Sequence, residues 1–186
     1  MISTTIDFLA ILTLVGDGLV IILLVGLACF RNQRIRGMVL WTGKHGIVFA
    51  FSISIIATLG SLFLSEIAHF TPCRLCWFQR ILMYPQVVIL GIALWKKERI
   101  ISLLNASILA IVGLGFAKYH YYLQMFSNSV KPCSTFDPVS CTEKVTVHFG
   151  YITIPMMSLT AFALILLFLA YVFIAHKKNQ TEPVGK

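Results

Sequence analysis

Charged residues are scarce in this sequence, and acidic residues are the scarcest of them. Asp, Glu, Lys and Arg together make up 12% of the 186 residues, and only seven residues are acidic. A soluble globular domain usually has about 25% charged residues. Hydrophobic residues account for 58% of the chain, more than a domain of this size can hide in its own interior. The composition therefore excludes an ordinary soluble fold and predicts a protein that crosses a membrane several times.

Other absences exclude further classes of function. The sequence has no internal repeat, no low-complexity tract and no Gly-rich phosphate-binding loop. Its net charge of +8 does not indicate nucleic-acid binding, because Lys and Arg form short clusters between apolar runs instead of one basic face. Such clusters are typical of the loops of a membrane protein.

The apolar residues form five long runs, and each is near the ~20 residues that an α-helix needs to cross ~30 Å of hydrocarbon. The runs lie at roughly 6–30, 45–68, 77–95, 100–123 and 151–175. Basic residues follow the first, third and fifth runs, whereas the gaps at 69–76 and 124–150 are poorer in Lys and Arg. The positive-inside rule then predicts an outer N-terminus, a cytoplasmic C-terminus, and both of those gaps outside.

The first run does not resemble a secretory signal, because residues 1–10 contain no Lys or Arg and the run is long. Cleavage at a lipoprotein-like box, GLAC at 26–29, is the alternative, and it would invert the predicted topology. We favour an intact span, in which Cys29 is a buried thiol without chemistry.

Asp17 lies near the middle of this first span, between Gly16 and Gly18. A carboxylate at this depth is costly and is by default a candidate functional group. We favour the alternative of a protonated or hydrogen-bonded Asp that faces the other helices, with the glycines allowing close packing.

Four of the five cysteines fall in the two gaps that are predicted to lie outside. Cys73 and Cys76 form a C-x-x-C pair, a spacing suited to exchanging two electrons or to holding a metal. Pro72 precedes the pair, and proline suits the first turn of a helix. We therefore expect the pair to open the third span, where the positive end of the helix dipole stabilises a thiolate.

Arg80 follows Cys76 by one helical turn and shares its face of the helix. A permanent charge inside a span requires a partner, and a Cys76 thiolate or a polar electron carrier beside it would be one. The alternative is that the Arg80 side chain extends back to the outer headgroups. The combination of C-x-x-C, helix start and arginine favours a functional site.

Cys133 and Cys141 enclose seven residues that include an Asp-Pro turn signal. We expect a disulfide in this small ring and favour exchange with the thiols of another protein over a purely structural bridge. Zinc bound by the four cysteines is an alternative that the longer second spacing and an oxidising exterior disfavour.

Two further classes of function fit the sequence less well. A cysteine hydrolase needs an oriented base, but the candidates His69, His120 and His148 form no recognisable arrangement. A transporter would account for Asp17 and Arg80 as intramembrane charges, but the sequence lacks repeated halves and the cysteines would have no role.

At these residues the chain resembles the DsbB family of membrane thiol–quinone oxidoreductases, and within it the short-looped BdbC-like branch. The resemblance covers residues 45–175 and rests first on residues 72–85, PCRLCWFQRILMYP. Supporting segments are YHY at 119–121, the Cys133/Cys141 loop, FGYITIP at 149–155 and SLTAF at 158–162. The related vitamin K epoxide reductases have the two cysteine pairs in the opposite order, which counts against them.

The resemblance implies an all-α fold, a four-helix transmembrane bundle with both cysteine pairs outside. Residues 1–30 would then be an additional N-terminal span, 45–175 the redox domain and 176–186 a cytoplasmic tail. The implied activity is a membrane disulfide oxidase. It would reoxidise an extracytoplasmic thioredoxin-fold (DsbA-like) dithiol protein and pass electrons to ubiquinone or menaquinone, which the respiratory chain reoxidises.

The resemblance also implies roles for individual residues. Cys133 would be attacked by the reduced partner, and Cys141 would be the other half of that disulfide. Electrons would pass to the Cys73–Cys76 disulfide, and Cys76 would transfer them to the quinone. Arg80 would lie by the quinone head group and His120 would line the same pocket, with no metal bound.

Overall fold

The computed structural model describes residues 2–29, 33–95, 100–126, 141 and 147–181, and these are mostly helical. Five long helices follow one another along the chain. They are α1 (Ile2–Ala28), α2 (Gln33–Leu62), α3 (Arg74–Trp95), α4 (Ile100–Phe126) and α5 (Ile154–Thr181), and a π-helical turn η1 (Phe63–Ile67) extends α2. All five helices are long and apolar enough to cross a membrane, which confirms the prediction of a polytopic all-α protein.

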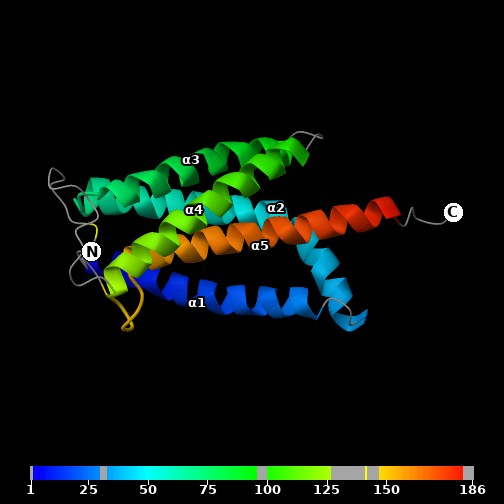
Figure 1. The fold of residues 1–186 in the computed structure, drawn as a ribbon, viewed down its shortest axis with the longest axis horizontal. Helices are drawn as coiled ribbons and strands as arrows, with labels where there is room; N and C mark the ends of the chain where they lie inside the picture. The colour runs from blue at the N-terminus through cyan, green and yellow to red at the C-terminus, as the bar shows by residue number, and fades with distance from the viewer. Residues whose placement is uncertain (1, 30–32, 96–99, 127–140, 142–146, 182–186) are drawn as a thin grey trace.

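The helices lie side by side along the long axis of the molecule and alternate in direction (Figure 1). The N-terminus of α1, the end of η1, and the beginnings of α3 and α5 share one end of the bundle, which we call the cysteine end. The C-terminus of α5 lies at the opposite end (Figure 1). The first cysteine pair therefore lies at the same end as the polar segment that precedes α5.

Helices α2, α3, α4 and α5 form a closed ring in which each packs against the next, and α1 packs outside it, mainly on α5. The outer surface carries many exposed apolar side chains, as expected where lipid replaces water. This arrangement confirms the expected four-helix bundle with one additional N-terminal helix.

Small residues let the helices of the bundle approach closely. Gly43 and Gly46 of α2 lie against the backbone of α5, at Tyr171 and Phe168. Gly113 of α4 faces the ring of Phe162, a fully buried side chain of α5. Because lipid tails are as apolar as the side chains, helices in a membrane associate through such close packing and through polar bonds.

Polar bonds fasten α1 to α5. The Asp17 carboxylate accepts hydrogen bonds from Thr160 Oγ1 at 2.6 Å and from Tyr151 Oη at 3.1 Å. The expectation of a hydrogen-bonded Asp17 that faces its neighbours is therefore confirmed. Gly16 does pack closely on Thr160, but a side chain at Gly18 would meet nothing within 4 Å, so the predicted packing role of Gly18 is wrong.

The prediction that Cys29 is a buried thiol is also wrong. Cys29 follows the last residue of α1 and is exposed. The reason is that α1 lies outside the four-helix ring and presents one face to α5, so a residue at its end has few neighbours to cover it.

A tight turn leads into α5 at the cysteine end. His148 and Ile152 form a β-bridge, and Phe149 and Gly150 between them both have positive φ, 52° and 79°. Glycine adopts this conformation without strain. The turn sets the His148 ring 3.3 Å from the Asp7 carboxylate of α1.

Replacing Gly113 by Leu is expected to destabilise the bundle. The added side chain would overlap the ring of Phe162, whereas Leu at Gly115 of the same helix would meet nothing within 4 Å at its Cβ. Overpacking a core costs about 1–3 kcal/mol. Thermal unfolding of the detergent-solubilised variants should show a lower midpoint for Gly113→Leu than for Gly115→Leu, and equal midpoints would contradict this packing.

Candidate functional site

Cys73 and Cys76 begin α3. The Cys73 carbonyl accepts a hydrogen bond from the Trp77 amide at 3.1 Å, and the Cys73 sulfur accepts one from the Cys76 amide at 3.4 Å. Cys73 thus occupies the N-cap position, where a side-chain acceptor satisfies an amide that the helix leaves unpaired. This geometry confirms that the C-x-x-C pair opens the third span.

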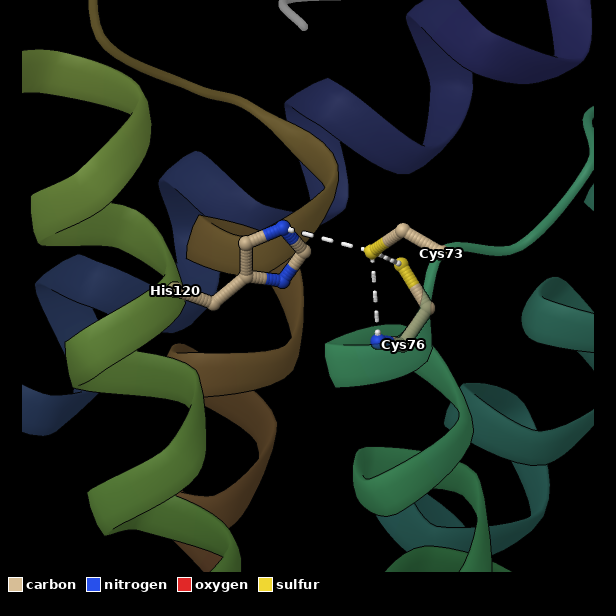
Figure 2. Close-up of side chains that lie close together, drawn as sticks. All are labelled: Cys73, Cys76 and His120. Carbon is tan, nitrogen blue, oxygen red and sulfur yellow. Dashed lines mark hydrogen bonds between the residues drawn. The ribbon is translucent and has the colours of Figure 1, made fainter. Parts of the chain in front are cut away.

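The two sulfur atoms lie 3.1 Å apart as free thiols, as Figure 2 shows. This separation is longer than the about 2.05 Å of a disulfide bond. It is nonetheless short enough for one thiol to donate a hydrogen bond to the other. The pair is placed to interconvert between dithiol and disulfide with little movement of the backbone.

His120 of α4 points at Cys73 from across the bundle (Figure 2), with Nε2 3.6 Å from the sulfur. The imidazole is buried, and its Nδ1 lies 3.0 Å from the Gln79 amide nitrogen. An amide nitrogen only donates, so in this arrangement Nδ1 accepts and Nε2 carries the ring proton. Gln79 therefore sets the tautomer that directs an N–H group at the Cys73 sulfur.

These contacts favour a thiolate at Cys73. The hydrogen bond from the Cys76 thiol contributes most, and the His120 ring and the Cys76 amide add to it. Together they outweigh the cost of burying a charge and hold the pKa of Cys73 below the ordinary thiol range. A thiolate is the form that attacks a disulfide, so the pair is chemically activated for exchange.

Arg80 finds its partner on α2. Its Nε donates to Ser61 Oγ at 3.0 Å and its Nη2 donates to the Ser61 carbonyl at 3.1 Å. Tyr84 donates to the same Ser61 hydroxyl at 3.2 Å, and the guanidinium lies 5.5 Å from the Trp77 ring centre. Ser61 precedes the π-helical turn η1, a type of irregularity that frequently occurs at functional sites.

A cavity of about 310 Å³ joins these groups. Its polar part includes Cys73, Cys76, Gln79, Arg80 and His120, and much of the remainder is apolar wall from α1, α2 and α5. The structure thus brings four of the predicted site residues, Cys73, Cys76, Arg80 and His120, to one cavity.

Of the second cysteine pair, the structure describes only Cys141. Cys141 is buried and disulfide-bonded, and it does not line the cavity. Cys133 lies outside the described residues, so its expected role stays a prediction. A zinc site of four thiolates is disfavoured further, because the sulfur of Cys141 is already bonded.

Gln79 and Ser61 are two residues of the site to which the sequence alone assigns no role. Gln79 is buried, which is unusual for a polar residue in a span, and its position three residues after Cys76 was a readable signal. Ser61 had no such signal, because its contact with Arg80 spans 19 positions and depends on how α2 packs against α3.

Cys73, Cys76 and His120 also form a group that is able to hold a metal ion, since one ligand atom of each lies within 4.8 Å of the others. Structural zinc sites usually have four ligands, and this group supplies three. The permanent positive charge of Arg80 on the same cavity opposes a divalent cation there. The donor set is therefore better suited to thiol chemistry than to a closed metal site.

In a comparison with known proteins, residues 43–172 match the family described as disulfide bond formation protein DsbB. The chain is 42% identical over 131 residues to disulfide bond formation protein C of Bacillus subtilis strain 168, covering 68% of this chain and 93% of that protein. It is likewise 42% identical over 131 residues to a probable disulfide formation protein of Deinococcus radiodurans, covering 66% and 84%. No solved structure matches the chain.

Replacing Gln79 by Leu is expected to raise the pKa of Cys73, because His120 loses the partner that fixes its tautomer. The pH dependence of Cys73 alkylation in the reduced protein measures this. In the unaltered protein alkylation should persist below the ordinary thiol range and be lost only as the pH falls through the lowered pKa. The Gln79→Leu variant should lose it at a higher pH, by about one unit, the value of one hydrogen bond.

Gln86→Leu is the matched control for this experiment. Gln86 is a buried glutamine of the same helix, and it does not line the cavity. If the pH dependence of Cys73 alkylation is unchanged in Gln79→Leu, or shifts equally in Gln86→Leu, the role assigned to Gln79 is contradicted.

Proposed function

Because this chain belongs to the DsbB family of disulfide bond formation proteins, we propose that this membrane disulfide oxidoreductase uses a quinone as its electron acceptor. Its electron donor is a thioredoxin-fold dithiol protein outside the cytoplasm. The observation that carries the proposal is the shared cavity, in which an activated cysteine pair and an arginine meet a largely apolar chamber.

The cavity fits the two halves of a lipid quinone. A quinone head group has two carbonyl acceptors, and its isoprenoid tail is apolar. In the described contacts, Arg80 donates two of its five N–H groups to Ser61. The other N–H groups are donors for a quinone carbonyl. Cys76 lines the same cavity, so its sulfur and the Arg80 guanidinium would contact the same quinone head group.

The cysteines divide the electron path between them. A thiolate of the partner attacks Cys133 and displaces Cys141, and the second partner thiol then closes the partner's own disulfide. The released pair of thiols reduces the Cys73–Cys76 disulfide by the same exchange. Cys76 passes the two electrons to the quinone, and His120 beside Cys73 directs its Nε2–H at that sulfur and so stabilises the Cys73 thiolate.

The reaction balances without another reactant. Two electrons and two protons leave the partner dithiol, which becomes a disulfide, and the quinone becomes a quinol. The respiratory chain then reoxidises the quinol. Exchange between protein dithiols is nearly isoenergetic, and about 30 mV of potential corresponds to about 1.4 kcal/mol for two electrons, so the quinone supplies the downhill step.

The basic clusters support an orientation with the cysteine end outside the cytoplasm. Lys and Arg are concentrated at residues 31–36 after α1, at 96–99 between α3 and α4, and at 177–178 near the end of α5. The C-terminal ends of α1, α3 and α5, which these clusters follow or overlap in the sequence, lie away from the cysteine end (Figure 1). In this orientation exported proteins reach the second cysteine pair, and the C-terminus is cytoplasmic.

Purified protein should reduce quinone anaerobically when a reduced thioredoxin-fold dithiol protein is supplied, with one quinol formed per donor disulfide. Cys76→Ser should abolish quinol formation because the sulfur that transfers electrons is absent. Cys29→Ser, which changes an exposed cysteine at the far end of α1, is the control and should retain full activity. Both variants should elute from size exclusion as the unaltered protein does.

Absence of quinol from folded protein, with several quinones and an intact donor, would overturn the oxidase proposal. The grouping of Cys73, Cys76 and His120 would then favour a metal-binding protein. Elemental analysis of the same preparation tests this alternative, since stoichiometric zinc would support the metal site.

Arg80→Ala should weaken quinone binding more than partner binding. The loss of a charged hydrogen-bond donor of about 1.5–3 kcal/mol corresponds to a rise in the KM for quinone of tenfold or more. The KM for the donor protein should change less than twofold. Lys44→Ala, which removes an exposed charge of α2 that does not line the cavity, is the control and should leave both constants unchanged.

A further inference from the structure

Helix α1 forms one wall of the cavity. Six of its residues line it, and they recur on one face of the helix: Leu9, Leu12, Thr13, Val15, Gly16 and Leu19. Thr13 is the only polar side chain among them, and its hydroxyl is bonded to the Leu9 carbonyl of its own helix. The contribution of α1 is therefore an apolar surface opposite the helices that carry the cysteines.

This wall is an addition to the family region. The matched residues begin at 43, beyond the end of α1 at Ala28. The alignment with the Bacillus subtilis protein covers 93% of that protein, which leaves too few residues for another helix of 27 residues. In a chain without α1, the side of the cavity that α1 closes here would face lipid.

Polar contacts hold α1 in place at three levels. At the cysteine end Asp7 pairs with His148, and further along Asp17 accepts from Thr160. Deeper in the span Tyr171 of α5 donates to the Leu23 carbonyl at 2.7 Å. Such bonds fix helices together in lipid, where no hydrophobic force does so. The wall is thus a fixed part of the cavity.

The gap between α1 and α2 is closed near the cysteines and open further along. At the closed end Leu9 lies against Gly60, where an added Cβ would be 3.3 Å from the Leu9 side chain. Beyond it Leu12, Val15 and Ile56 line the cavity and are also 37%, 64% and 44% exposed. Residues that face both the cavity and the exterior form the rim of an opening.

We propose that this opening between α1 and α2 is a lateral portal through which the isoprenoid tail of a lipid quinone passes between the cavity and the bilayer. This inference rests on the proposed function. The head group would lie by Arg80, beneath the Leu9–Gly60 contact, and the tail would leave between Leu12, Val15 and Ile56. Helix α1 would then favour tailed lipid quinones over small quinones that need no portal.

Large side chains at the rim should discriminate between quinones that differ only in the tail. Menaquinone-4 and menadione share a naphthoquinone head, and ubiquinone-2 and ubiquinone-0 share a benzoquinone head. One of these two pairs should contain the quinones that the unaltered protein reduces. In the Leu12→Trp/Val15→Trp variant, kcat/KM for the tailed quinone of that pair should fall at least tenfold. The value for the tail-free member should stay within twofold.

Ile11→Trp is the matched control. Ile11 is an exposed residue of α1 that does not line the cavity, so tryptophan there faces lipid without narrowing the opening. It should leave kcat/KM for both members of each pair unchanged. An equal loss in Ile11→Trp and the rim variant would attribute the effect to α1 packing and overturn the portal.

A binding measurement tests the same point without turnover. A naphthoquinone with a diazirine on its isoprenoid tail is irradiated with the full-length protein, and the labelled peptides are mapped. Label should appear on the α1 peptide that contains Leu12 and Val15 and on the α2 peptide that contains Ile56. Excess menaquinone-4 should suppress it, and the rim variant should show less of it.

The outcomes separate the two proposals. Quinone reduction with label confined to other helices, and no tail-selective loss in the rim variant, would overturn the portal while the oxidase function stands. Failure of all four quinones to be reduced by folded protein would overturn both. Suppressible label on α1 together with a tail-selective loss would establish the portal.

Discussion

The start of α3 is the constraint on which the rest of the site depends. With Cys73 at the N-cap, its sulfur takes a backbone hydrogen bond and the next cysteine falls one turn away, 3.1 Å from the first. The same helix then places Gln79 toward His120 and Arg80 toward Ser61. One helix start therefore fixes the sulfurs, their activation and the charge beside them.

The membrane explains why so many polar side chains of this bundle bond to one another. Lipid gives helices no hydrophobic reason to associate, so position is fixed by close packing at glycines and by polar bonds. Arg80 with Ser61, His120 with Gln79 and Asp17 with Thr160 each link two helices. Two of these three links also orient groups of the redox site, so packing and chemistry share the same side chains.

Much of the fold was readable from the sequence, because span length and basic clusters obey strong physical rules. The C-x-x-C pair at a helix start and Arg80 one turn later were readable for the same reason, since helical periodicity is local. The contact between Ser61 and Arg80 and the exposure of Cys29 were not readable from the sequence, because both depend on how the helices pack against one another. Local chemistry was predictable, and contacts between distant helices were not.

Helix α1 shows how an addition to a family fold changes a site without touching its chemistry. None of its residues contacts the sulfur atoms in the described contacts, yet six of them line the cavity that the sulfurs share. Its carboxylate, Asp17, is used for attachment, since both oxygens accept hydrogen bonds from residues in or just before α5. A half-buried carboxyl group that the sequence marks as a candidate functional group is thus accounted for by the need to hold a wall in place, while the proposed route into the cavity lies along the apolar face beside it.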